Sequence, residues 1–73
     1  MTEAKNGRCE LTNVLFQQGD YTTGELYFIA HGSVVSDPKG RFYIGDKIRT
    51  SVVQEINLKE GWFVTLNTKY YIV

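Results

Sequence analysis

The sequence predicts a single small all-β domain, and three features of the chain lead to this prediction. Seven glycines and the single Pro38 divide the 73 residues into apolar runs of strand length with no long helical pattern between them. Aromatic residues make up 14% of the chain, which suits a domain too short to build its core from smaller side chains. The length allows one domain. We expect a five- or six-stranded meander that forms a small SH3-like barrel or a strongly bent antiparallel sheet.

The N-terminal part of the chain holds an expected tail and a run of ambiguous pattern. Residues 1–8 are expected to be a flexible tail, and residues 9–73 to form the domain. Residues 9–17 are ambiguous, because three apolar residues have the spacing of one helix face while the Thr and the branched and aromatic residues favour a strand. We interpret this run as a strand.

The next apolar run, residues 25–30, alternates with the period of a strand. The alternation places Leu26 and Phe28 toward the core, and Tyr27 and Ile29 on the opposite, outward face. Residues 31–40 follow as a loop or short edge strand that contains the turn sequence Asp-Pro-Lys-Gly.

The strand expected over residues 47–56 has Ile48, Val52 and Ile56 at inward positions. The same alternation brings Thr50 inward, and a bulge near Val52 and Val53 would relieve this conflict by shifting the phase. The outward positions of this strand hold Lys47, Arg49, Ser51 and Val53.

Residues 57–61 are expected to close a hairpin into a strand at residues 62–66. The predicted inward residues of that strand are Trp62, Val64 and Leu66. Residues 67–69 turn again, and residues 70–73 form a last strand that must be held by pairing.

The side chains on which enzymes depend are scarce in this chain. Cys9 is the only cysteine and His31 the only histidine, so the sequence supports neither a disulfide framework nor a structural zinc site. The glycines match no phosphate-binding spacing. We therefore expect no enzyme activity, no cofactor and no metal.

Charge is distributed unevenly along a chain whose formal net charge is zero. Residues 38–73 hold six basic and three acidic side chains, a net charge of +3, whereas residues 1–37 hold two basic and five acidic ones, a net charge of −3. Basic groups interleaved with aromatics are how small barrels hold single-stranded nucleic acid. A nucleic-acid-binding face is therefore one hypothesis, and it would use Tyr43, Lys47, Arg49, Trp62 and Lys69.

The leading hypothesis is a protein-interaction module that binds a protein partner or forms a homodimer. A sheet this small cannot cover both of its faces, and uncovered apolar stripes commonly mark interaction sites. The residues expected to carry this contact are Tyr27, Ile29, Phe63 and Tyr71.

The C-terminal half also has a recognisable order of motifs. His31-Gly32 precedes the threonine-serine strand of residues 45–53, and a terminal segment runs from Asn67 to Tyr70. This order resembles that of small uncharacterised bacterial and phage-borne proteins. The resemblance implies an accessory protein of a mobile element and brings no activity with it. No apolar run has the length of a signal peptide or a membrane span, and we expect a cytoplasmic protein.

Overall fold

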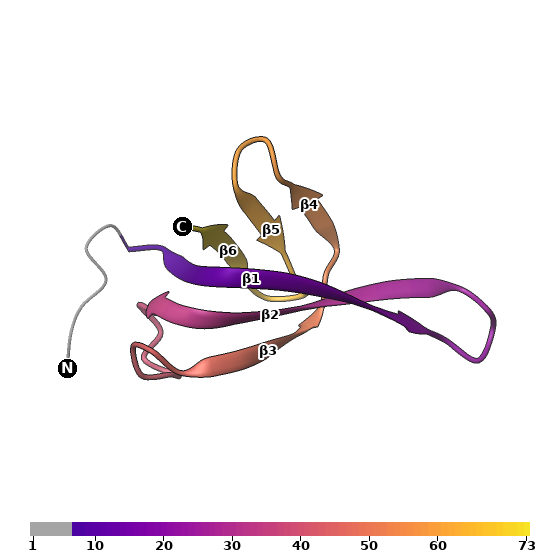
Figure 1. Cartoon of the computed structure of the whole chain (residues 1–73), viewed down its shortest axis with the longest axis horizontal. Helices are drawn as coiled ribbons and strands as arrows, with labels where there is room; N and C mark the ends of the chain where they lie inside the picture. The colour runs from indigo at the N-terminus through magenta and orange to yellow at the C-terminus, as the bar shows by residue number, and fades with distance from the viewer. Residues whose placement is uncertain (1–6) are drawn as a thin grey trace.

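The computed structural model describes residues 7–73, which form six strands and no helix (Figure 1). Positions 1–6 of the expected tail lie outside the described residues. The strands are β1 (Cys9–Asp20), β2 (Leu26–Ser36), β3 (Lys47–Val52), β4 (Glu55–Asn57), β5 (Trp62–Val64) and β6 (Lys69–Ile72). The predicted all-β class is confirmed.

The six strands of the described chain make one sheet in the order β3-β2-β1-β6-β5-β4. β1 and β6 pair in parallel, and the other four pairs are antiparallel. The sheet is therefore mixed and is not closed into a barrel, so it matches neither SH3-like closure nor a wholly antiparallel sheet. The parallel pair arises because the last strand returns along β1 in the same direction as β1. If β6 ran antiparallel to β1, the whole sheet would be antiparallel, as expected from the sequence.

The linker between β3 and β4 bends the sheet sharply. Val53 N donates a hydrogen bond to Phe28 O in β2, and Gln54 N donates one to Val64 O in β5, over 2.7 and 2.6 Å. These two adjacent residues thus tie together the two halves of the sheet, β1–β3 and β4–β6. Both halves consequently turn their inner faces toward a shared core.

A bulge explains why residues 9–17 have a mixed pattern. β1 loses register with β2 between Thr12 and Leu15, and Asn13 has a φ of 54°. The extra residues shift the strand's phase, so Leu11 and Phe16 both face the core although they are five positions apart. The expected strand is confirmed, and the bulge accounts for the helix-like spacing of its apolar residues.

The core centres on Phe63, whose side chain is fully buried. The Phe16 ring meets it edge-on at 5.3 Å, and the Tyr70 ring stacks on it at 5.2 Å. The predicted inward face of β5 was therefore wrong: Trp62 and Val64 are half-buried on its other face, and Leu66, after β5, is exposed. The strand turns Phe63 inward because β4 and β6 flank it and place Tyr70 directly opposite.

The β1–β2 hairpin extends well beyond the rest of the sheet (Figure 1). β3 ends opposite Ile29. Apart from the hydrogen bond that Val53 N donates to Phe28 O, residues 17–28, which we call the arm, pair only within the hairpin. The alternation of β2 is confirmed, but Leu26 and Phe28 are 58% and 40% exposed rather than buried. On the N-terminal side of Ala30, β2 extends away from the core, and no other part of the described sheet covers these two side chains.

Candidate interaction surface

The outward face of the arm carries a pair of packed tyrosine rings. The Tyr27 ring lies across Gly19, where an added Cβ would fall 2.3 Å from Tyr27 Cζ. The Tyr21 ring packs against Tyr27 with a centroid distance of 4.6 Å. Because Gly19 has no side chain, Tyr27 can lie along the strand instead of standing away from it. The result is a partly exposed pair of rings near the arm's tip, tilted by 44° against each other.

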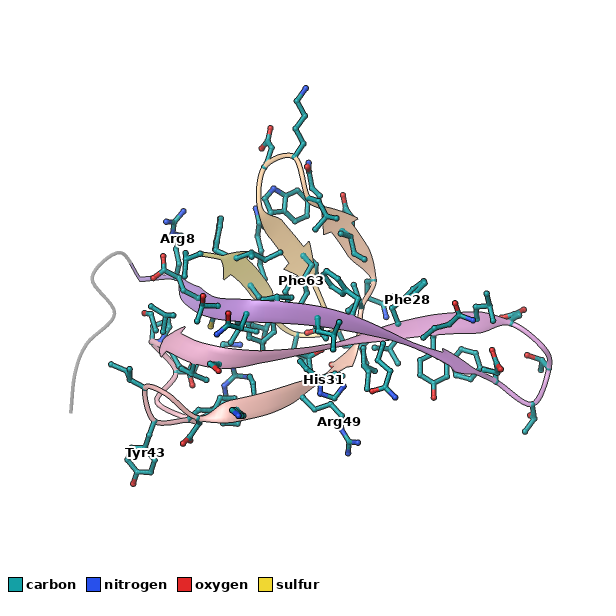
Figure 2. The ribbon with its side chains drawn as sticks, viewed as in Figure 1. Arg8, Phe28, His31, Tyr43, Arg49 and Phe63 are labelled. Atoms are coloured by element: carbon teal, nitrogen blue, oxygen red, sulfur yellow. The ribbon has the colours of Figure 1, made fainter. Side chains whose placement is uncertain are left out.

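At the base of the arm the same face becomes an open groove. Its lining includes Leu15, His31 and Ile48, and Leu15 is 65% exposed. Gln17 Oε1 lies 2.7 Å from His31 Nε2, a hydrogen bond in which the imidazole donates. Arg49 pairs with His31 across β2 and β3, and Figure 2 shows these two side chains beside each other. The groove therefore combines an exposed apolar side chain with a basic rim.

Opposite charges occupy the two ends of this face. The exposed Lys47 and Arg49 line the groove at the base, which confirms the predicted outward positions of both. At the tip, the exposed Glu25 lies on this face, whereas Asp20 lies opposite Leu26 on the other face, and residues 17–29 include neither Lys nor Arg. The arm thus has an acidic tip and a basic base.

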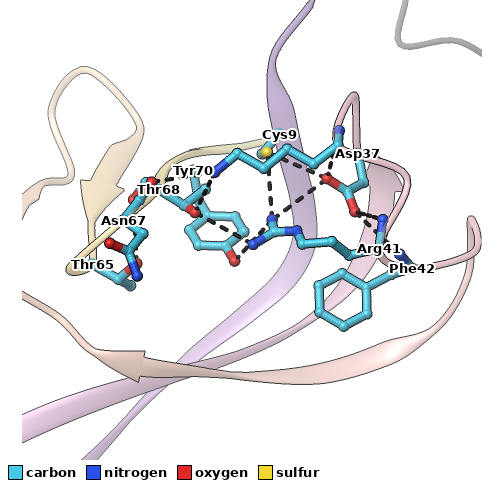
Figure 3. A network of polar contacts seen from close by, with 9 residues as sticks. Cys9, Asp37, Arg41, Phe42, Thr65, Asn67, Thr68 and Tyr70 are labelled. Atoms are coloured by element: carbon cyan, nitrogen blue, oxygen red, sulfur yellow. Dashed lines mark hydrogen bonds and ion pairs between the residues drawn. The ribbon is translucent and has the colours of Figure 1, made fainter.

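A polar network fastens the loop after β2 to the last strand (Figure 3). The Asp37 carboxylate accepts hydrogen bonds from the backbone N–H groups of Lys39, Arg41 and Phe42, over 2.8 to 3.2 Å. The Arg41 guanidinium meets Asp37 at 3.5 Å and the Thr68 hydroxyl at 3.4 Å. All these partners are satisfied by one another, so the network has the character of a structural clasp.

The titration of Asp37 and Cys9 agrees with a structural role. Burial alone would raise the pKa of Asp37, but the hydrogen bonds from the Arg41 backbone and side chain outweigh it and lower that pKa below its ordinary value. Burial, and then the neighbouring Asp37 carboxylate, raise the pKa of the Cys9 thiol. A thiol with a raised pKa is a poor nucleophile. This network therefore supplies no activated group.

The residues predicted to carry protein interaction do not form one surface. Tyr27 and Ile29 lie together on the outward face of β2, half-buried. Tyr71 is half-buried on the outward face of β6, in the other half of the sheet. The outward placement of Phe63 was wrong, because its ring fills the core (Figure 2).

The residues of the nucleic-acid hypothesis are also divided between the two halves. Lys69 Nζ lies 4.3 Å from the Trp62 ring centroid and 5.2 Å from that of Tyr71, on the outward face of β5 and β6. The Arg8 guanidinium lies 4.2 Å from the Tyr71 ring. Lys47 and Arg49 belong to β3, whose outward face points away from this cluster because both halves turn inward toward Phe63. Tyr43, 83% exposed, stands in the loop before β3.

Sequence reasoning missed three contributors to the arm face: Leu15, Tyr21 and His31. The phase of Leu15 could not be assigned because the bulge at Asn13 lies between it and the start of the strand. Gly19 was a usable signal for Tyr21 and Tyr27, because a glycine within a strand often marks a place where a neighbouring ring lies across the backbone.

Comparisons with known proteins add no relative: no family, curated protein or solved structure matches the chain. Within residues 7–73, no three His, Cys, Asp or Glu side chains come together in a group that could hold a metal ion. The described part of the chain also has no helix long and apolar enough to cross a membrane.

Proposed function

We propose that this chain is a non-enzymatic interaction module whose arm is its contact element, binding a protein partner or self-associating. The observation that carries the proposal is the exposure of apolar side chains on both faces of the arm, Leu26 and Phe28 on one and Tyr21 on the other, where Leu15 is also exposed at the base. Exposed apolar surface of this kind, gathered on one projecting element, commonly marks an interaction site.

The arm's composition is not explained by folding. The buried hydrophobic residues of the described chain are Cys9, Leu11, Ala30, Val34, Phe63 and Tyr70, and none of them lies in residues 17–28. A hairpin that only capped the sheet could be shorter and more polar. The large apolar side chains of the arm therefore suit a surface that a partner covers.

The non-enzymatic part of the proposal is supported by the two side chains with the strongest catalytic potential. Cys9 is buried and has a raised pKa, and the His31 ring is hydrogen-bonded to Gln17. Neither lies within a triad-like arrangement of the described residues. An accessory role in a mobile element rests on the resemblance of the C-terminal half alone.

The test replaces two outward residues by Ser: Tyr27 in the arm and Ile29 at its base. We expect the double variant to keep the wild-type circular dichroism spectrum and to lose assembly or partner binding in sedimentation and pull-down measurements, because it removes the apolar contact area. Leu58→Ser, at a leucine 65% exposed in the β4–β5 turn, is the control and should bind as wild type does. A folded double variant with unchanged binding would refute the arm as contact element.

A second candidate function is single-stranded nucleic-acid binding by the cluster of Trp62, Lys69 and Tyr71. The observation in its favour is the cation-aromatic packing of Lys69 against both rings. Aromatic stacking and phosphate attraction both contribute to such binding.

Binding of a fluorescent single-stranded oligonucleotide should therefore weaken steeply as salt increases. The Trp62→Ala and Lys69→Ala variants should each lower its affinity, and Lys47→Ala should leave it unchanged. Equal affinity of all three variants and the wild type at low salt would exclude this candidate.

A further inference from the structure

We infer that the partner of the arm is a second copy of this chain, docked about a two-fold axis so that the acidic tip of each arm lies over the basic base of the other. This inference rests on the proposed function and names the occupant of the same surface. It is carried by two features of one face: the opposite charges at its ends and the order of its side chains.

The charges make the face complementary to itself when it is reversed. The base carries Lys47 and Arg49 on β3, and the tip carries Glu25 beside Tyr21. In a parallel arrangement like charges would meet at both ends. In an antiparallel arrangement about a two-fold axis, each acidic tip meets a basic base, and the same favourable contact forms twice.

The strand pairing shows which residues would meet. From base to tip the rows of this face are Ser33 with Lys47, then Leu15 with His31 and Arg49, then Gln17 with Ile29, then Gly19 with Tyr27, then Tyr21 with Glu25. The middle row of the five is Gln17 with Ile29. A two-fold axis through that row superposes the first row on the fifth and the second on the fourth.

The resulting contacts are chemically matched. The Glu25 carboxylate of one copy reaches Lys47 of the other, where exposed charges attract. The flat Tyr27 ring meets Leu15 and Arg49, which gives it an apolar neighbour and a cation over its face. The rows span about 27 Å at the usual rise of a strand, a length that the arm and base supply within a molecule 42 Å long.

The experiment is a charge exchange followed by sedimentation equilibrium. The base variant Lys47→Glu with Arg49→Glu and the tip variant Glu25→Lys should each weaken the dimer about tenfold or more, because like charges then face each other. An equimolar mixture of the two variants should form a heterodimer, and the variant carrying all three changes should dimerise again. All three positions are exposed, so folding should be retained.

A cross-link tests the position of the axis. Gln17→Cys places a thiol in the row through which the axis passes, and it should give a disulfide-linked dimer under mild oxidation. Lys59→Cys, in the exposed turn between β4 and β5, is the control and should remain monomeric on a non-reducing gel.

The outcomes separate this inference from the proposed function. Recovery of the dimer in the mixture of oppositely charged variants supports the inference. A wild-type chain that stays monomeric at high concentration overturns it, and so does a dimer whose stability is unchanged by all three charge changes. If the Tyr27 and Ile29 double variant still loses assembly or partner binding in either of those cases, the arm remains the contact element with another occupant. If that variant binds unchanged as well, the proposed function fails too.

Discussion

Replacing Phe63 by Ala should remove a large part of the protein's free energy of unfolding. The side chain is fully buried between Phe16 and Tyr70, and truncating such a residue costs about 3 to 5 kcal/mol through lost transfer energy and the cavity left behind. Domains of ordinary stability unfold with only about 5 to 15 kcal/mol. Urea denaturation followed by circular dichroism measures the loss.

The adjacent Trp62 provides the control for this prediction. It is half-buried on the outward face of the same strand, so Trp62→Ala should cost clearly less than Phe63→Ala. An equal loss of the free energy of unfolding in the two variants would contradict the assignment of Phe63 to the inward face of β5 and Trp62 to the outward face.

Replacing Asp37 by Ala should destabilise the protein by about 2 to 4 kcal/mol at neutral pH. Three backbone N–H groups of the following loop lose their acceptor, and Arg41 loses its ion pair. Thermal unfolding of the variant, beside the exposed Asp20→Ala as control, measures this difference. A loss no larger than that of the control would show that the loop does not depend on the clasp.

The contribution of Asp37 should also depend on pH in a defined direction. Its pKa in the folded protein lies below the ordinary value of 3.8, because hydrogen bonds to Arg41 outweigh the effect of burial. The folded state therefore binds the proton less readily than the unfolded state. The stabilisation is complete well above pH 3.8 and is lost as pH falls through the lower folded-state pKa. The stability gap between wild type and Asp37→Ala should narrow correspondingly in acid.

The clasp and the arm have different relations to the core. The clasp joins the loop after β2 to Thr68 and Tyr70, so its loss should loosen the packing of β6 against β1. The arm makes no such connection beyond the hydrogen bond from Val53 N to Phe28 O. Changes in the arm should therefore alter binding with little effect on stability, and changes in the clasp should do the reverse.

The sequence by itself determined the class of the fold and most of the strand positions. Glycines at the turns and alternating apolar residues are local signals, and a strand's two faces can be read from them where no bulge intervenes. The alternation of β2, the outward direction of Lys47 and Arg49, and the β4–β5 hairpin were all predicted for this reason. The uneven charge of the two halves of the chain was also visible, although not its arrangement on one face.

The tertiary structure alone decided which faces are covered and how the strands are ordered. The bulge at Asn13 shifts the phase of β1, and the direction of β6 depends on a pairing with residues some sixty positions away. Phe63 rather than Trp62 enters the core because Phe16 and Tyr70 approach from other strands. The exposure of Leu26 and Phe28 depends on where β3 ends. Burial is a property of contacts between distant segments, and local alternation specifies the two sides of a strand without specifying what covers either one.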